Sequence, residues 1–421
     1  MKIAIISAVD FVPWQFRSEF IATLIYNGHD VTVISSKGPY VERLQAIGAK
    51  HIAIPLNRFI SPLTDLLYLF RLYFTLRNIK PDIVYAMTAK PTFFAPIIAK
   101  CLNVPQVYNM YGGIGFIHVD GGSYLMKIIK RIARLIQRYG GKFVDFFIFQ
   151  NHDDYNIFLR NQIITEKNSI VVNGSGVNCH EFNIESVNQS RINNIRHELG
   201  LSESTRIVLM VSRVAKNKGI LEFINAGRYF ENHNEPIQFL HAGSVEKGSL
   251  ENVVISQIQE TKNFKQIGFR MDIKDIISMS DIVVLPSYHR EGIPNTLLEA
   301  MAMKKPIVTT NNVGCRDVVD DGINGFLIPI RDADALANAI EKLIDNPVLR
   351  KQMGEIGYEK IQRQFTVESI NKIILQQVFQ MNDIQIPDFY TEETSNGLFI
   401  SLNGEQRFVS VNPISTDHVL N

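Results

Sequence analysis

The 421-residue chain has little that would mark a secreted, membrane-spanning or nucleic-acid-binding protein. Its three cysteines, Cys101, Cys179 and Cys315, lie far apart, with neither an even count for disulfides nor metal-ligand spacing. Its 43 Lys and Arg residues balance 42 Asp and Glu residues, and a net charge of +1 does not suit a nucleic-acid partner. No apolar run is long enough to span a bilayer. The apolar run at residues 3–7 is too short for a signal peptide and Asp10 follows it closely, so we expect a buried parallel strand there. We expect a reduced, cytoplasmic protein.

Two further signatures are missing where cofactors would bind. The loop after the first expected strand, residues 8–13, has no glycine pattern, so a dinucleotide fingerprint is absent. Asp332 and Asp334 have the spacing of a metal-binding D-x-D pair. They stand at the start of an expected helix, residues 335–343, and we interpret them as an N-cap and a first-turn acid. The sequence thus predicts no cofactor and no metal ion.

What the chain does have is an alternation of short β-branched runs with longer amphipathic segments, which predicts an α/β fold. The strands expected in the first half are residues 3–7, 31–35, 82–87, 106–110 and 144–150. Those expected in the second half are residues 206–211, 237–241, 266–269, 281–285 and 306–309. Both halves are therefore predicted to be Rossmann-like, doubly wound domains, whose ligands bind beyond the carboxyl ends of the strands.

The expected domains are residues 1–180 and 204–363, joined by a polar linker at residues 181–203. Another helix is expected within residues 364–380. Residues 381–421 differ in character, with polar stretches and short alternating runs. They fit either a small hairpin or a disordered extension, and we assign them no function.

The most informative segment is residues 286–300, PSYHREGIPNTLLEA. Its polar loop holds Glu291, and a helix carrying Glu299 is expected to begin near Pro294, because proline is tolerated in a first helical turn. The amino end of a helix binds phosphate, whereas a carboxylate beside a phosphate suits the neutral hydroxyls of the same ligand. Glu299 taken alone is explained equally well by the helix dipole. Together, the features predict a sugar nucleotide as the ligand.

A second pattern lies about eighty residues upstream. The strand at residues 206–211 ends in SRVAKNKG, which contains Arg213 and Lys218, and an apolar-periodic helix follows at residues 220–229. Arginine offers a planar fork to phosphate oxygens and lysine a point charge. Cations are disfavoured at the positive end of a helix, so a solvated helix start is a poor explanation for them.

In this order and spacing, the two segments resemble the E-x7-E and S/G-R-x4-K-G motifs of family 4 (group 1) retaining glycosyltransferases, whose GT-B fold has two Rossmann-like domains facing a central cleft. The resemblance covers about residues 1–380 and implies that Glu291 contacts the donor sugar and Glu299 the nucleotide ribose. It also implies that Arg213 and Lys218 grip the donor diphosphate, so that Glu291, Arg213 and Lys218 are the catalytic residues. The other expected donor-binding residues are Gly243, Arg270, Gly292, Ile293, Pro294, Asn295 and Thr296.

The resemblance assigns acceptor binding to the first domain and implies that the helix of residues 364–380 crosses back to it. The glycine-rich residues 111–115 occupy a place where many family members keep a histidine, and bacterial members that act on lipid-linked sugars look similar. Glycine allows close approach of the backbone to a ligand. We name Gly112 and Gly113 as acceptor-binding, together with Arg17, which is a candidate for an acceptor phosphate. An exposed helix arginine is the simpler interpretation of Arg17.

A basic amphipathic helix is expected at residues 123–138. Its apolar residues alternate with basic ones: Leu125, Ile128, Ile129, Ile132 and Leu135 with Lys127, Lys130, Arg131, Arg134 and Arg138. Such a helix can bind an anionic membrane surface. A core-packed helix with a solvated basic face fits equally well. Residues 58–71, rich in Phe, Leu and Tyr, are a candidate apolar patch beside it.

The sequence therefore predicts a retaining, metal-independent glycosyltransferase of bacterial surface polysaccharide or glycan assembly. We expect it to move a hexose or N-acetylhexosamine from a UDP-sugar to a polyprenyl-diphosphate-linked saccharide at the inner face of the cell membrane. One alternative is a UDP-sugar 2-epimerase of the same fold, which would act on UDP-N-acetylglucosamine without an acceptor. The other is a non-catalytic glycan-assembly scaffold, which would not need to retain Glu291, Arg213 and Lys218.

Overall fold

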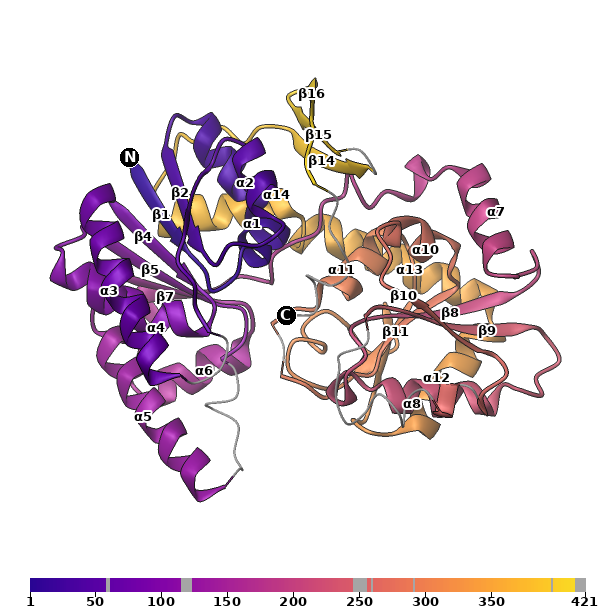
Figure 1. Cartoon of the computed structure of the whole chain (residues 1–421). Helices are drawn as coiled ribbons and strands as arrows, with labels where there is room; N and C mark the ends of the chain where they lie inside the picture. Colours follow the sequence, from indigo (N-terminus) through magenta and orange to yellow (C-terminus); the bar gives the residue numbers. More distant parts are fainter. Residues whose placement is uncertain are drawn as a thin grey trace. The chain divides into compact units, whose positions relative to one another are not determined.

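The structure, a computed structural model, consists of two compact units (Figure 1). Unit 1 joins Met1–Ser175 to the segment that begins at Glu368, and unit 2 holds Gly176–Val367. The structure describes residues 1–57, 61–114, 123–244, 256–258, 260–290, 292–394 and 397–412.

Unit 1 is a parallel sheet with helices on both faces. Its strands in the described ranges are β1 (Lys2–Ile6), β2 (Asp30–Ser35), β3 (Lys50–Ala53), β4 (Ile83–Met87), β5 (Gln106–Tyr111), β6 (Phe146–Phe149) and β7 (Ser169–Val171). They pair in the order β3-β2-β1-β4-β5-β6-β7. The helices are α1 (Phe11–Tyr26), α2 (Val41–Ala46), α3 (Pro62–Ile79), α4 (Ala89–Cys101), α5 (Tyr124–Gly141), α6 (His152–Arg160) and α14 (Val367–Ile373), which continues as a π-helix over Ile374–Val378.

The alternation of side chains along β1 explains the two layers. Ile3 and Ile5 lie in a core with α1 and α14, whereas Ala4 and Ile6 lie in a second core with α3, α4 and α6. All four side chains are fully buried, as expected for a central parallel strand. The strand order reverses between β1 and β4, so the loops after these strands diverge at the carboxyl edge.

Unit 2 repeats this plan. Its strands in the described ranges are β8 (Arg206–Val211), β9 (Ile237–Ala242), β10 (Phe264–Gly268), β11 (Ile282–Leu285), β12 (Ile307–Thr310) and β13 (Gly325–Ile328). The order is β10-β9-β8-β11-β12-β13, with the reversal between β8 and β11. The helices are α7 (Gln189–Glu198), α8 (Ile220–Tyr229), α10 (Ile273–Met279), α11 (Asn295–Ala302), α12 (Ala333–Ile344) and α13 (Pro347–Gln364). The prediction of two doubly wound α/β domains is confirmed.

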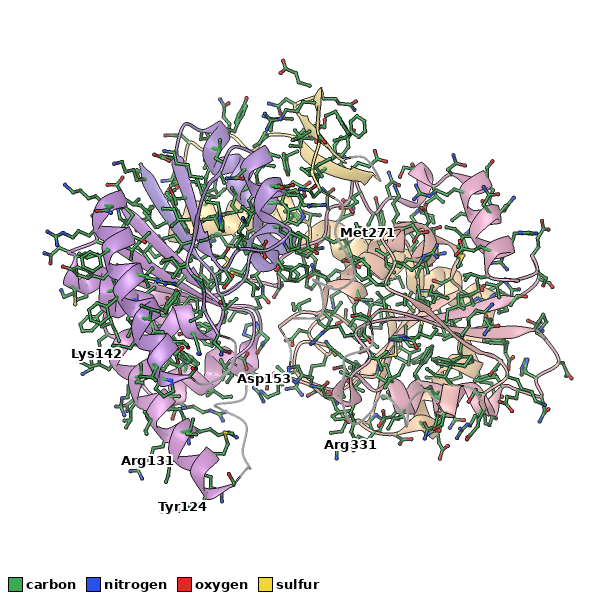
Figure 2. All side chains as sticks on the ribbon, viewed as in Figure 1. Tyr124, Arg131, Lys142, Asp153, Met271 and Arg331 are labelled. Carbon is green, nitrogen blue, oxygen red and sulfur yellow. The ribbon has the colours of Figure 1, made fainter. Side chains whose placement is uncertain are left out.

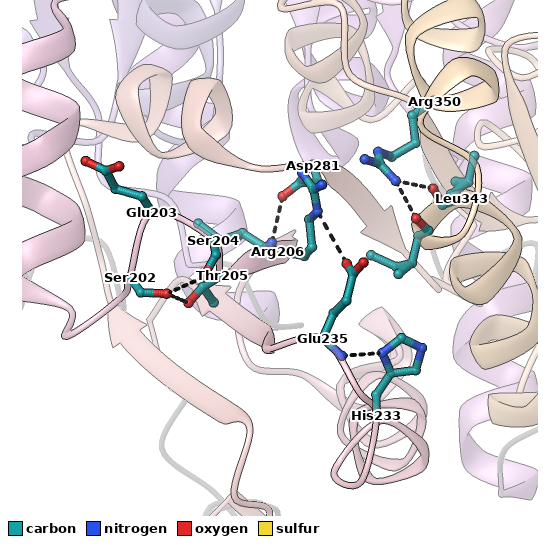
Figure 3. Close-up of polar contacts among 12 residues, drawn as sticks. Ser202, Glu203, Ser204, Thr205, Arg206, His233, Glu235, Asp281, Leu343 and Arg350 are labelled. Carbon is teal, nitrogen blue, oxygen red and sulfur yellow. Dashed lines mark hydrogen bonds and ion pairs between the residues drawn. The ribbon is translucent and has the colours of Figure 1, made fainter.

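Charged side chains at the amino edge of the unit 2 sheet satisfy one another (Figure 3). The Asp281 carboxylate accepts from the Arg206 guanidinium at 3.1 Å and from the Ile207 backbone N–H at 2.9 Å. Arg206 also lies 3.7 Å from the Glu235 carboxylate. Arg350 donates to two carbonyls at the end of α12, both at 2.6 Å. This edge is a structural network, in contrast to the carboxyl edge.

The N-cap interpretation of Asp332 is confirmed. Its carboxylate accepts from the Ala335 backbone N–H at 2.8 Å and so satisfies a free amide in the first turn of α12.

For the segment after residue 380, the sequence was compatible with either a small hairpin or a disordered extension. It contains a three-stranded antiparallel sheet, β14 (Phe389–Thr394), β15 (Gly397–Leu402) and β16 (Glu405–Val409). Leu398 and Ile400 on its inner face lie in the unit 1 core, in the same cluster as Trp14. Reciprocal hydrogen bonds of 2.7 and 3.0 Å between Asn27 and Gln385 tie the preceding segment to the end of α1.

We predict that Ile400→Ala lowers the stability of unit 1 by about 2–4 kcal/mol, because it opens a cavity in the unit 1 core. Phe399→Ala is the matched control on the same strand, since Phe399 is 39% exposed on the other face and should cost about 1 kcal/mol or less. Urea unfolding can be followed by the fluorescence of Trp14, the one tryptophan of the chain. Equal losses for the two variants would contradict this packing.

Candidate functional site

Two loops meet at the point where the strand order of unit 2 reverses. The backbone N–H groups of Tyr288 and His289, after β11, donate to the carbonyl of Asn217, after β8, at 3.0 and 3.1 Å. The Ser287 hydroxyl donates to the same carbonyl at 3.2 Å. One carbonyl therefore fastens together the two segments that carry the predicted motifs.

Close backbone packing reinforces this junction. Gly219 has φ +82°, and a Cβ there would lie 2.2 Å from the Pro286 carbonyl oxygen, so only glycine fits. Gly219 ends the short 3₁₀ turn Lys216–Lys218 and begins α8. Lys218, which is half-buried, directly precedes Gly219 and therefore lies next to the contact between the two loops. Arg213, in the same loop, is exposed.

Gly243 packs against the same loop from β9. A Cβ at Gly243 would lie 1.7 Å from the Ser212 carbonyl oxygen, and its φ is +151°. The Val214 N–H donates to the Ser244 carbonyl at 2.8 Å. The described structure therefore gives Gly243, a predicted donor-binding residue, a packing role beside Arg213.

The helix expected near Pro294 is α11, with Pro294 as its N-cap. The Thr296 hydroxyl donates to the carbonyl of Val211, the last residue of β8, at 3.3 Å. This bond brings the amino end of α11 to the β8 loop. Of the predicted donor-binding residues here, Gly292, Ile293 and Pro294 are buried, whereas Asn295 and Thr296 are half-buried. Glu291 lies outside the described residues.

Glu299 lies in the second turn of α11, and no hydrogen bond joins its half-buried carboxyl group to another described residue. Burial, with a smaller contribution from the negative charge of Glu181, raises the pKa of Glu299 to about 8. Burial raises the free energy of the ionised carboxylate. Hydrogen bonds donated by a ligand would lower it, so this carboxyl group is well suited to accept them.

Arg270 is paired differently from the expected arrangement. Its guanidinium donates to Asp272 at 2.6 and 2.8 Å and to Glu198 at 2.7 Å. The two carboxylates raise the pKa of Arg270 above its usual value. In the described structure Arg270 therefore anchors α7 to the loop after β10, and its predicted contact with the donor would require it to exchange partners.

In unit 1, Arg17 is buried, with 2% of its surface exposed, so the interpretation as an exposed helix arginine is wrong. It lies three residues after Trp14 and three before Phe20, on the inner face of α1. Its guanidinium donates to the Phe16 carbonyl at 2.7 Å and reaches the Ser175 carbonyl at 3.4 Å. The helical spacing of Arg17 with apolar neighbours was the signal for burial.

The other predicted acceptor residues lie near the same point. A Cβ at Gly112 would lie 3.2 Å from the Gln150 side-chain oxygen, and Gln150 donates to the Ser175 hydroxyl at 3.1 Å. Ser175 therefore links Arg17 to the residues that flank the glycine loop. Sequence reasoning did not identify Gln150 or Ser175, since their contacts span 25 positions of the chain.

Asp154 supports the other end of this loop. Its buried carboxylate accepts from the Ile114 N–H at 3.1 Å and from the Asn151 side chain at 3.0 Å. Gly113, between these supports, has φ +136°, which favours glycine. The three predicted acceptor-binding residues are thus held at the carboxyl edge of one sheet.

The basic amphipathic helix is α5. The apolar Ile128, Ile132 and Leu135 are 40%, 51% and 60% exposed, so the core-packed alternative is wrong. Lys130, by contrast, is buried, and the side chain of Leu125 lies outside the described part. Among the helices that the structure describes, none has the length and apolarity needed to cross a membrane.

Comparisons with known proteins agree with both units. Residues 2–151 match the model of the glycosyl transferase 4-like family, and residues 191–360 match that of the glycosyl transferases group 1 family. A relative from Campylobacter jejuni, N,N'-diacetylbacillosaminyl-diphospho-undecaprenol alpha-1,3-N-acetylgalactosaminyltransferase, is 26% identical over 84% of this chain and 92% of its own. The UDP-Gal:alpha-D-GlcNAc-diphosphoundecaprenol alpha-1,3-galactosyltransferase of Escherichia coli is 28% identical over 76% and 81%.

Solved structures give the same fold. Anabaena Alr3699/HepE in complex with UDP matches with a TM-score of 0.76 at 18% identity, over 90% of this chain and 100% of that one. A glycosyltransferase from Rickettsia africae matches with a TM-score of 0.74 at 20% identity, over 91% and 99%. The chain therefore belongs to the group 1 glycosyltransferases and has their two α/β domains in the GT-B fold.

Proposed function

We propose that this glycosyltransferase acts in the assembly of bacterial surface polysaccharides or glycans. It would move a hexose or N-acetylhexosamine from a UDP-sugar to a polyprenyl-diphosphate-linked saccharide, with retention and without a metal ion. The observation that carries the proposal is the junction at the strand-order reversal of unit 2, where Arg213, Lys218 and Glu299 belong to connected segments. The acceptors named for the Campylobacter and Escherichia coli relatives support the choice of acceptor, and the UDP held by HepE supports the choice of nucleotide.

The donor would bind with its diphosphate against the β8 loop. Arg213 and Lys218 supply two positive charges there, and the amino end of α11 adds a positive dipole. These groups can stabilise the charge that collects on the departing diphosphate, which is the task a bound cation performs in metal-dependent transferases. Gly243 and Thr296 would hold this arrangement in place through their contacts with the β8 loop.

The two glutamates would serve different parts of the donor. Glu299 would accept hydrogen bonds from the ribose hydroxyls, which offset the cost of ionising its half-buried carboxyl group. Glu291 would contact the sugar that is transferred. Because that sugar changes charge during the reaction and the ribose does not, Glu291→Ala should lower kcat and Glu299→Ala should mainly raise the donor KM.

Retention would follow from attack on the face that the diphosphate leaves. The acceptor hydroxyl oxygen forms a bond to the anomeric carbon as the bond from that carbon to the phosphate oxygen breaks. The hydroxyl proton passes to an oxygen of the released UDP. An enzyme base is then unnecessary, and Gly112 and Gly113 would let the acceptor approach closely.

The acceptor lipid would hold the enzyme at the inner face of the cell membrane. The exposed cations of α5 suit the anionic lipids of that surface, and Ile128, Ile132 and Leu135 are exposed between them. Binding to anionic vesicles should therefore weaken as salt is added.

The function is tested by incubating the enzyme with a panel of UDP-sugars and a synthetic undecaprenyl-diphosphate-linked acceptor. We expect UDP release, an elongated acceptor with the donor's anomeric configuration, and the same rate in EDTA. Activity that is lost in EDTA and restored by manganese would contradict metal independence. Conversion of UDP-N-acetylglucosamine without acceptor would indicate the epimerase, and binding without any turnover the scaffold.

Arg213→Ala and Lys218→Ala should each lower kcat by about 10²–10³, by analogy with the loss of one donor to a developing oxyanion. The double variant should lose less than the product of the two effects if both cations act on one diphosphate. Lys216→Ala is the matched control, because Lys216 is an exposed lysine of the same turn. Near-normal turnover of folded Arg213→Ala and Lys218→Ala proteins would rule out these roles.

UDP binding should release a proton from Glu299 at pH 7.5. The free carboxyl group has a pKa of about 8, and hydrogen bonds from ribose favour its ionised form, so the pKa falls on binding. Calorimetry in two buffers of different ionisation enthalpy measures the released proton, which should vanish above about pH 9.5. Glu299→Gln should bind UDP without this release. An unchanged release in Glu299→Gln would place the proton on another group.

A further inference from the structure

Helix α3 of unit 1 presents a row of large apolar side chains to solvent. The row follows helical spacing along one side of the helix, so it forms a single stripe. We call these residues the α3 stripe: Leu63, Leu66, Leu67, Phe70 and Phe74, exposed by 84%, 53%, 49%, 58% and 54%.

Core packing does not explain the α3 stripe, because the core already uses the opposite side of the helix. Tyr68, Leu72 and Leu76 on that side are 1%, 0% and 1% exposed. Neighbouring contacts hold this orientation: Lys90 of α4 forms an ion pair with Asp65 at 2.5 Å. An apolar surface of this size on a fixed helix marks an interaction site.

The helices around the stripe carry charge of almost one sign. α3 and α5 both pack against α4, so the three helices form one side of unit 1 (Figure 1). Their one acidic residue is Asp65, already paired with Lys90, although the whole chain has 43 basic and 42 acidic residues. Their basic residues are Arg71, Arg77, Lys90, Lys100, Lys127, Lys130, Arg131, Arg134 and Arg138.

The predominance of basic residues on these three helices indicates which kind of partner binds the α3 stripe. A second copy of the chain in a symmetric dimer would place the same patch on both sides and bring cations against cations. A membrane with anionic headgroups offers phosphate to the cations and an acyl boundary to the apolar side chains. Figure 2 shows Tyr124 and Arg131 on the part of α5 that projects beyond the sheet, where a planar surface can reach them.

We propose that α3 is the lipid-inserting element of this enzyme. The α3 stripe enters the acyl boundary of an anionic membrane, while the cations of α5 hold the headgroups. The inference deepens the proposed membrane association, which rested on α5. The membrane affinity would then have two contributions. The electrostatic attraction of α5 is weakened by salt, whereas the apolar insertion of α3 is not.

The insertion is measured with a tryptophan reporter. Trp14 is 7% exposed and gives a constant background, so Phe70→Trp adds one probe on the stripe. With vesicles of phosphatidylglycerol and phosphatidylcholine, we expect a blue shift of its emission and quenching by brominated acyl chains. Tyr229→Trp is the matched control, because Tyr229 is 57% exposed on α8 of unit 2 and should show neither effect.

The two parts of binding are separated by salt. In high salt, Leu67→Gln combined with Phe70→Gln should weaken cosedimentation with these vesicles by about tenfold or more, because the remaining attraction is apolar. Arg131→Glu combined with Arg134→Glu should weaken it at low salt and have little effect at high salt. Circular dichroism checks that each variant is folded.

Cosedimentation without quenching at Phe70→Trp would overturn the role of α3 and leave the membrane proposal standing. Absence of cosedimentation under all conditions would overturn both. A blue shift without vesicles that rises with protein concentration, together with dimers in the ultracentrifuge, would show that a second copy covers the stripe.

Discussion

The contact between Gly219 and Pro286 is the constraint on which the candidate donor site depends. It lets the backbone after β8 lie directly against the backbone after β11, so that one carbonyl, that of Asn217, receives donors from Ser287, Tyr288 and His289. Any side chain at residue 219 would push the two loops apart. Their separation would move Lys218 and the start of α8 away from the segment that leads into α11. The positive charge of Lys218 would then lie farther from the carboxyl group of Glu299.

The two edges of the unit 2 sheet use charge in opposite ways. At the amino edge, Arg206 and Asp281 form an ion pair, and Asp281 also accepts from the Ile207 backbone N–H, so these charges serve the fold. At the carboxyl edge, Glu299 is half-buried and has no hydrogen-bond partner among the residues that the structure describes, and burial raises its pKa to about 8. Burial makes the ionised form of Glu299 costly in the free enzyme. Hydrogen bonds from a ligand would stabilise that form and so favour binding, which explains why a half-buried carboxyl group lies in the site.

The sequence predicted the features that local pattern controls. The bounds expected for β8 and α8 agree with the structure, because β8 is a buried apolar run that begins at the charged Arg206 and α8 is an apolar period that begins after Gly219. The N-cap role of Asp332 also followed from neighbours three residues away. By contrast, β3, β7 and β13 were not predicted from the sequence, because each is a short strand at a sheet edge whose side chains are only partly buried, so no continuous buried run marks it. The contact of Arg17 with the Ser175 carbonyl and the pairing of Arg270 with Glu198 depend on packing between distant segments, which residue spacing alone does not encode.

Hydrogen–deuterium exchange with and without UDP tests most directly the claim that the strand-order reversal of unit 2 binds the donor nucleotide. The account predicts that UDP slows exchange of the amides in residues 213–219 and 292–299, with no change at the amino edge around Arg206. Slowed exchange confined to the glycine loop of unit 1, or at the amino edge of unit 2, with residues 213–219 unaffected, would contradict it.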